Sequence, residues 1–212
     1  MAKVRYLLMA SEPWRFGDSV IAELRGICGV KGSPLYDHLF EYKLEKSFLE
    51  ADAEYYDRNP EALGDIVPIG GIETYNMPLD VKASLGQPHP SGIRAMRLLH
   101  SEGFIFSGTI DLFDAGPIMS VHRDTIRTIM SARTASISAS PSGSQGAMTL
   151  VSSGKVKNFK AILTPAVVNG DRLLVLPNAL HALGVTMGSH VRFWQAESRE
   201  SLSEETLVKA HL

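Results

Sequence analysis

A histidine held between two prolines, His89 between Pro88 and Pro90, is the residue of this sequence best placed to do chemistry. Each proline fixes its own φ angle and drives the residue before it toward extended geometry, so His89 cannot lie inside a helix. Ser91 is a candidate N-cap for the helical pattern that follows, which places His89 just before unpaired backbone N–H groups. Imidazole titrates near neutral pH and can hold and release a proton. The pattern favours an acid–base site; the alternative is a turn histidine that only packs or hydrogen-bonds.

The other residues whose side chains could take part in a reaction are less well placed. Asp111 and Asp114 are three positions apart on a predicted strand and its exit turn, which puts their carboxylates on opposite faces and argues against a paired acid and base. Asp114, followed by Ala-Gly-Pro, has the composition of a turn former. His38 has no second histidine or carboxylate at metal-ligand spacing, so we assign no metal site. The single cysteine, Cys28, excludes an intrachain disulfide and favours a buried thiol.

The residues around His89 resemble the arginine N-succinyltransferase family in order and spacing. Gly-Gln-Pro-His-Pro at residues 86–90 is followed by Glu-Gly-Phe at 102–104 and by Ile-Asp-Leu-Phe-Asp-Ala-Gly-Pro at 110–117. The likeness begins near the start of the chain and includes residues 20–26. In that family the histidine of Gly-Gln-x-His-Pro is the assigned proton donor. The resemblance implies this catalytic role for His89.

The chain departs from the family pattern shortly before His89. Family members carry a His-Pro-Ile-Tyr run where this sequence has Gly70-Gly71-Ile72-Glu73. The Glu73 carboxylate favours a cationic amino acid through a charge-assisted hydrogen bond, so Glu73 is a candidate substrate-binding residue. Because of this departure, the sequence does not decide whether the amino-acid substrate is arginine or ornithine.

The reaction that the resemblance implies is transfer of a succinyl group from succinyl-CoA to the α-amino group of arginine, in arginine catabolism. Succinyl-CoA is then a co-substrate, and no permanently bound cofactor is expected. The superfamily binds CoA with an Arg-x-x-Gly-x-Gly or Ala loop, whose N–H groups cradle the pyrophosphate at a helix N-terminus. The sequence has no such run, so we assign no CoA-binding residue.

In family members the CoA-binding half precedes the residues that match this chain. We therefore expect the C-terminal part of a succinyltransferase, which needs a second chain or self-association to be complete. The alternatives are a non-catalytic partner or fragment that completes an acyltransferase fold, and a small-molecule binding protein derived from one. The complete His89 motif argues mildly against both alternatives.

Composition narrows the class of partner. The 212 residues are 44% hydrophobic and 21% charged, with a net charge of −2, so no basic field for nucleic acid or an anionic membrane is present. A small-molecule partner fits better. The sequence has no apolar run near the roughly 20 residues that span a bilayer and no signal peptide, so a cytoplasmic protein is expected.

The patterns of apolar and turn residues predict an α+β chain. A helix that closes on Gly103 and runs into a strand pair resembles the end of the acyl-CoA N-acyltransferase (GNAT) fold, with a partial mixed sheet and helices. We expect the C-terminal half of such a domain at 1–133, a Ser/Ala/Gly/Pro-rich linker at 134–147, a small, mostly-β module at 148–197 and a tail at 198–212. One predicted helix begins at Pro34, with Ser33 as its N-cap. Others span 48–56, 121–131 and 178–183, and another ends at His100. The predicted strands are 20–27, 65–69, one beginning at 104, 109–113, 148–151, 159–164, 172–176 and 190–194.

Overall fold

The computed structural model describes residues 2–30, 32–57 and 71–196. They form an α+β chain, as predicted, and divide into two compact units. The described residues within 19–122 include His89 and make up the histidine unit; residues 2–18 and 123–196 make up the barrel unit. Within these ranges no helix is long and apolar enough to cross a membrane. The predicted strand at 65–69 and the tail at 198–212 lie outside the described residues.

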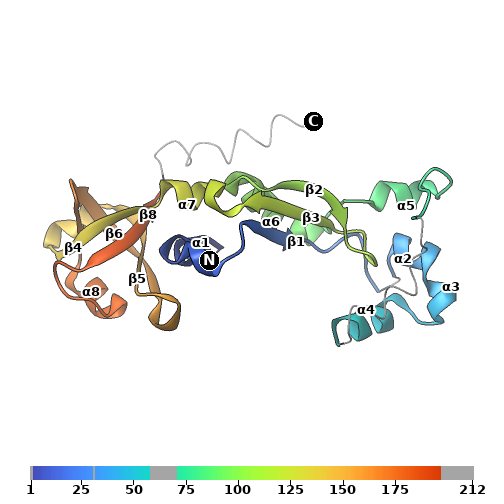
Figure 1. Cartoon of the computed structure of the whole chain (residues 1–212), viewed down its shortest axis with the longest axis horizontal. Coiled ribbons are helices and arrows are strands. Elements are labelled where there is room, and N and C mark those ends of the chain that lie inside the picture. The colour runs from blue at the N-terminus through green and yellow to red at the C-terminus, as the bar shows by residue number, and fades with distance from the viewer. Residues whose placement is uncertain (1, 31, 58–70, 197–212) are drawn as a thin grey trace. The chain divides into compact units, whose positions relative to one another are not determined.

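The histidine unit contains a three-stranded antiparallel sheet in the order β1-β3-β2 (Figure 1). β1 (Ser19–Glu23) and β2 (Ile105–Ile110) are the outer strands, and β3 (Pro117–His122) pairs with both. α6 (Ile93–Glu102) leads into β2 and ends at Gly103, whose φ of 99° lies in the left-handed region that glycine adopts without steric cost. The predicted helix end at Gly103 is confirmed.

The strand predicted at 109–113 is only partly correct, since its first two residues end β2 and the other three are not in a strand. β2 ends at Ile110, and the next residues form a turn. Asp111 Oδ1 accepts the backbone N–H groups of Phe113 and Asp114 at 2.8 and 2.9 Å. A side chain that captures two successive backbone donors takes them away from a strand ladder, so the chain turns here instead of extending.

Short helices cover the rest of the histidine unit, and four buried aromatic rings form the centre of one core. The helices are α2 (Pro34–Leu39), α3 (Glu41–Leu44), α4 (Phe48–Asp57) and α5 (Leu79–Ser84). The rings, which pack tilted or edge to face with centroids 5.4 to 6.2 Å apart, are Tyr36, Phe40, Phe48 and Phe113. α2 begins at Pro34 as predicted. However, the predicted N-cap Ser33 makes no cap bond, because its hydroxyl donates to the carbonyl oxygen of Phe113 at 2.8 Å.

The barrel unit is built on a closed five-stranded sheet in the order β4-β7-β6-β5-β8. Its interior is filled by apolar side chains, mostly alanine, valine, leucine and isoleucine together with Phe193, and α8 (Pro177–Leu183) packs against it. The strands are β4 (Arg133–Ala139), β5 (Ala147–Ser153), β6 (Lys160–Asn169), β7 (Arg172–Val175) and β8 (His190–Gln195). The four strands and the helix predicted after residue 147 are all present.

The linker predicted at 134–147 is wrong, because these residues form β4 and the short helix η5 (Pro141–Gln145). β4 pairs in parallel with β7 and antiparallel with β8, so the barrel closes only through it. Only Ala135 and Ile137 of β4 are buried. Residues 134–139, Thr-Ala-Ser-Ile-Ser-Ala, do alternate between polar and apolar, but their small side chains have the composition of a linker, which led to the wrong prediction. The barrel therefore begins at residue 133.

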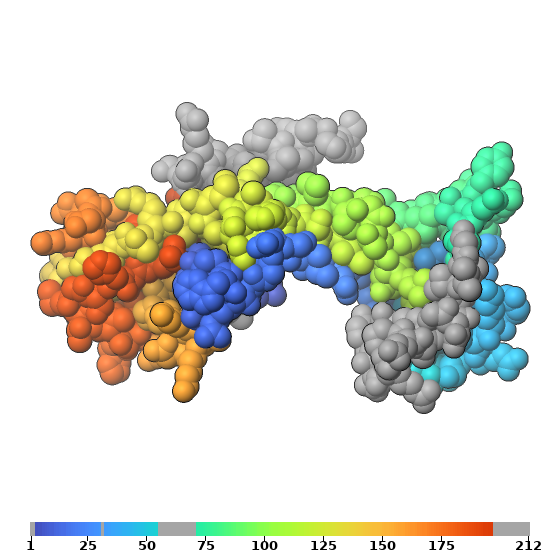
Figure 2. All heavy atoms as spheres, viewed as in Figure 1, coloured from blue at the N-terminus to red at the C-terminus, as the bar shows by residue number. Residues whose placement is uncertain are grey.

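α1 (Ala2–Ser11) packs on the barrel and contacts α7, β5 and β8 (Figure 2). The Lys3 ammonium lies 3.9 Å above the centre of the Trp194 ring of β8. The helix predicted at 121–131 is only partly correct, since its first two residues end β3 and the remainder is split into η4 (Arg123–Thr125) and α7 (Arg127–Ser131). The break lies at Ile126, whose backbone is extended with a φ of −61° and a ψ of 125°. The Arg123 guanidinium donates to the carbonyl oxygens of Pro13 and Phe16, both at 2.7 Å, and so ties η4 to the residues that follow α1.

Candidate functional site

The loop that carries His89 is tied down by its backbone at two places. The His89 N–H donates to the carbonyl oxygen of Arg25 at 2.7 Å, as part of an isolated antiparallel bridge between Pro88 and Gly26. The Gly86 N–H donates to the carbonyl oxygen of Ala115 at 2.9 Å. The loop therefore joins the chain that follows β1 to the turn that precedes β3, and all three segments belong to the histidine unit.

Two glycines allow the chain that follows β1 to lie directly against the turn that precedes β3. A Cβ atom added to Gly26 would overlap the carbonyl oxygen of Asp114, and one added to Gly116 would overlap that of Leu24. The neighbouring atoms are backbone and cannot move aside as a flexible side chain would. Only glycine fits where two backbones pack this closely. The strand predicted over 20–27 ends at Glu23 because the following residues turn to this contact.

Asp114 is a turn former, as predicted, and it is also part of an ionic network. Its Oδ1 accepts the Gly116 N–H at 2.7 Å, and its Oδ2 lies 3.2 Å from Arg25 Nε. Burial raises the pKa of the Asp114 carboxyl, while the N–H groups of Gly116 and Gly26 act in the opposite direction. Asp114 thus holds the two glycine backbones together.

The Arg25 guanidinium connects this turn to α4. It donates to both carboxylate oxygens of Asp52 at 3.1 and 2.7 Å, and its Nε donates to Cys28 Sγ at 3.2 Å. The bonds to Asp52 raise the pKa of Arg25 above its ordinary value. Cys28, predicted to be a buried thiol, is only partly buried and packs against the aromatic core. Arg25 therefore supports the His89 loop with its carbonyl oxygen and anchors that same backbone with its side chain.

The His89 ring is half-buried and is held by the residue two positions further on. Its Nδ1 lies 2.7 Å from Ser91 Oγ and accepts the Ser91 backbone N–H at 3.2 Å. Ser91 was predicted as the N-cap of the next helix. In the structure His89 itself caps the short helix η3 (Pro90–Gly92), and Gly92 stands at the N-cap of α6.

Comparison with known proteins agrees with this arrangement. The family model described as arginine N-succinyltransferase beta subunit matches residues 1–128, and the model for its C-terminal domain matches residues 132–195. The chain belongs to the arginine N-succinyltransferase family. The segments that meet at His89 are those whose sequence resembles this family.

Curated relatives are similar over nearly the whole chain. The arginine N-succinyltransferase subunit beta of Pseudomonas aeruginosa is 27% identical over 193 residues, which are 91% of this chain and 57% of the relative. The arginine N-succinyltransferase of Yersinia pestis is 28% identical over 200 residues, with the same coverage of 91% and 57%. The solved structure of arginine/ornithine succinyltransferase subunit AI from Pseudomonas aeruginosa matches with a TM-score of 0.76 and 28% identity, over 92% of this chain and 56% of that one. This member of the arginine N-succinyltransferase family spans a little over half the length of these relatives.

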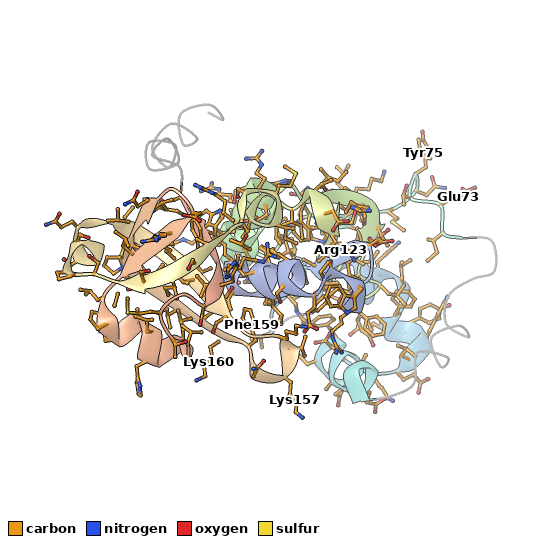
Figure 3. The ribbon with its side chains drawn as sticks, turned by 60° about the vertical axis from the view of Figure 1, so that its left-hand side comes forward. Glu73, Tyr75, Arg123, Lys157, Phe159 and Lys160 are labelled. Carbon is orange, nitrogen blue, oxygen red and sulfur yellow. The ribbon has the colours of Figure 1, made fainter. Side chains whose placement is uncertain are left out.

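Glu73, the predicted substrate-binding residue, lies on the segment that precedes α5. Its side chain is exposed and, like that of Tyr75, points outward (Figure 3). The Lys82 ammonium of α5 donates to the carbonyl oxygen of Tyr75 at 2.6 Å and holds this segment against the helix. Gly70, the first residue of the departure from the family pattern, lies outside the described residues. The role of Glu73 stays a prediction.

Sequence reasoning assigned no role at the site to Arg25 or Asp52. Arg25 is a charged residue within an apolar stretch, a pattern that fits an exposed face, a contact with another charge or a contact with a ligand. Asp52 sits among several acidic residues of α4 and carries no local signal. For metal binding, the described part of the chain contains no cluster of three or more His, Cys, Asp or Glu side chains that could hold an ion.

Proposed function

We propose that this chain carries the catalytic histidine of an arginine N-succinyltransferase, which transfers the succinyl group of succinyl-CoA to the α-amino group of arginine in arginine catabolism in the cytoplasm. The observation that carries the proposal is His89. The resemblance of residues 86–90 to the family's Gly-Gln-x-His-Pro motif gives His89 the role of proton donor. Its loop is fixed by two prolines and by a 2.7 Å bond to the Arg25 carbonyl oxygen. Membership of the family over residues 1–128 supports the reaction type.

The reaction needs proton transfers that an imidazole can make. The neutral amine attacks the thioester carbonyl carbon, a C–N bond forms and the carbonyl oxygen becomes negative. When the tetrahedral intermediate collapses, the C–S bond breaks, the attacking nitrogen loses a proton and the CoA thiolate takes one up. A positioned acid–base group of this kind contributes about two to four powers of ten in rate. His89 fits this role because its backbone has little freedom to move the ring.

We further infer that the sheet of the histidine unit is part of a larger, GNAT-like mixed sheet that a second polypeptide segment completes. β1 and β2 each pair with one neighbour among the described residues. Ile21 on β1 and Ile105 on β2 are 60% and 66% exposed. Apolar side chains on outer strands favour association with another chain or copy. The P. aeruginosa relative is a beta subunit, and this chain spans 57% of its length.

The first test is replacement of His89 in the assembled enzyme. We expect His89→Ala to lower kcat by at least about a hundredfold while the circular dichroism spectrum stays unchanged. His38→Ala is the matched control, because His38 is an exposed histidine on α2, and it should retain kcat within about twofold. An unchanged kcat in His89→Ala would favour the second candidate, a non-catalytic partner that completes an acyltransferase fold. That candidate is supported by the length of the match, because this chain covers only 57% of the P. aeruginosa relative.

The second test concerns succinyl-CoA, for which the sequence offers no phosphate-cradling loop. Calorimetry on the purified chain should give no tight binding. Binding should appear when the polypeptide that supplies the remaining half of the enzyme is added. Micromolar affinity of the monomeric chain alone would show that the half-site interpretation is wrong, and that the chain's own residues hold CoA.

A further inference from the structure

We propose that Ser91 is a positioning residue that holds neutral His89 with its proton on Nε2, so that Nε2 is the nitrogen that exchanges protons with the reacting groups. The proposal rests on the proposed function for its catalytic consequence. The protonation pattern itself follows from the geometry of the ring and is measurable without turnover.

The first step concerns the backbone of Ser91. Its N–H lies 3.2 Å from His89 Nδ1. An amide N–H can only donate a hydrogen bond, so Nδ1 must present its lone pair to it. In a neutral imidazole one nitrogen carries the proton and the other accepts, and the bond made by one nitrogen therefore decides the state of the other. Neutral His89 is then the Nε2–H tautomer.

The second step concerns the Ser91 hydroxyl, which lies 2.7 Å from the same nitrogen. A hydroxyl can both donate and accept. It can donate to the Nδ1 lone pair of the neutral ring, and it can accept from Nδ1–H when the ring carries a second proton. The hydroxyl is thus able to stay bonded to Nδ1 in both states. A proton can then enter and leave at Nε2 without loss of the bond that orients the ring.

The third step concerns the backbone that carries this pair. His89 is the N-cap of η3, with a φ of −52° and a ψ of 144°, and Pro90 occupies the first position of that helix. The Gly92 N–H donates to the His89 carbonyl oxygen at 2.7 Å, which closes the turn. The ring thus takes the place that a serine or aspartate side chain takes in an ordinary N-cap. Both hydrogen bonds of the ring within the described residues are made at Nδ1, which leaves Nε2 for the substrate.

The same chain provides an internal reference with the opposite geometry. His100 Nδ1, near the end of α6, lies 3.1 Å from the carbonyl oxygen of Phe104. A carbonyl oxygen can only accept, so Nδ1 of neutral His100 must carry the proton. The two histidines are therefore expected to be opposite tautomers.

The direct test is a long-range ¹H–¹⁵N correlation spectrum of the ¹⁵N-labelled chain, at a pH where the histidines are neutral. The variants His89→Gln and His100→Gln assign the signals by removing them. We expect a pyridine-like Nδ1 and a pyrrole-like Nε2 for His89, and the reverse for His100. A pyrrole-like Nδ1 for His89 would overturn the proposal whatever the enzyme's activity. If instead the proposed function is wrong, His89→Ala will leave kcat unchanged.

The functional test separates the hydroxyl from a general effect on the helix. Ser91→Ala keeps the backbone N–H, which selects the Nε2–H tautomer, and removes Oγ, which keeps the ring oriented as it gains and loses a proton. We therefore expect the tautomer to stay as in the wild type, kcat to fall about three- to tenfold and KM to stay unchanged. Ser91→Thr restores a hydroxyl and should recover kcat. Ser101→Ala is the matched control, because the Ser101 hydroxyl on α6 donates to the Leu98 carbonyl oxygen and should leave both readouts unchanged. A wild-type kcat in Ser91→Ala would overturn the role of the hydroxyl.

Discussion

The backbone N–H of His89 donates to the carbonyl oxygen of Arg25 at 2.7 Å, and this bond ties the histidine to an ionic network. The Arg25 guanidinium is bound by Asp52 of α4 and lies 3.2 Å from a carboxylate oxygen of Asp114 in the turn before β3. The position of His89 is therefore set by residues about 60 positions before it and 25 after it, as well as by its own prolines.

Gly26→Ala should destabilise the histidine unit, because its Cβ would overlap the Asp114 carbonyl oxygen. Overpacking of this kind costs about 1–3 kcal/mol, and a backbone neighbour places the effect at the upper end of that range. Hydrogen–deuterium exchange of peptides covering residues 86–90 and 111–117 should speed up. Gly29→Ala is the control, because a Cβ there meets nothing within 4 Å. Equal protection in the two variants would mean that the close approach does not limit stability.

Asp114 should make the stability of the histidine unit fall as pH rises. Burial raises the pKa of this carboxyl above its ordinary 3.8, so the folded protein holds the proton at a pH where the unfolded chain has lost it. Its stabilising contribution is full below 3.8 and is lost as pH rises through the raised pKa. In urea unfolding, the free energy of the wild type minus that of Asp114→Asn should decrease across this window and then level off. A difference that increases with pH would contradict the sign of the shift.

Glu12 should act in the opposite direction in the barrel unit. It is 3% exposed, and its Oε2 accepts the Val156 N–H at 2.8 Å, which lowers the pKa of the Glu12 carboxyl; Arg15 adds to the effect. The contribution is full above the unfolded value of about 4.5 and is lost as pH falls through the lowered pKa. The advantage of the wild type over Glu12→Gln should therefore be largest at neutral pH.

Tryptophan fluorescence in urea measures this effect, because both tryptophans, Trp14 and Trp194, belong to the barrel unit. Glu23→Gln, an exposed change in the histidine unit, should leave the tryptophan transition where it is at every pH. If Glu12→Gln shows the same acid dependence as the wild type, its bond to Val156 does not couple to unfolding.

Glu73→Gln tests the predicted substrate contact. If the carboxylate of Glu73 binds a cationic amino acid, its loss should change the ratio of kcat/KM for arginine to kcat/KM for ornithine. The loss of a charge-assisted hydrogen bond of about 1.5–3 kcal/mol corresponds to roughly a tenfold or larger fall in kcat/KM for the better substrate. Asp80→Asn, an exposed acidic residue in the first turn of α5, is the matched control. An unchanged ratio would show that Glu73 does not contact the amino-acid substrate.

The sequence predicted correctly those helix ends that a proline or a glycine marks. Pro34 marked the start of α2 and Gly103 the end of α6, because proline and glycine restrict or free the backbone wherever they stand. The predicted caps failed where a side chain had a better partner. Ser33 bonds to Phe113, 80 residues away, and Ser91 bonds to the ring of His89. Neither partner is visible in a helix-start pattern.

The sequence by itself determined that His89 stands outside regular structure, because the prolines on both sides act through covalent geometry alone. It also carried enough of the family's motifs to indicate the chemistry. Only the tertiary structure decided that residues 25–26 and 111–116 meet the loop, and that β4, which has a linker's composition, closes a barrel. These choices depend on hydrogen bonds between segments far apart in the chain. Such bonds satisfy backbone groups that would otherwise be buried unpaired, and no local residue pattern encodes their partners.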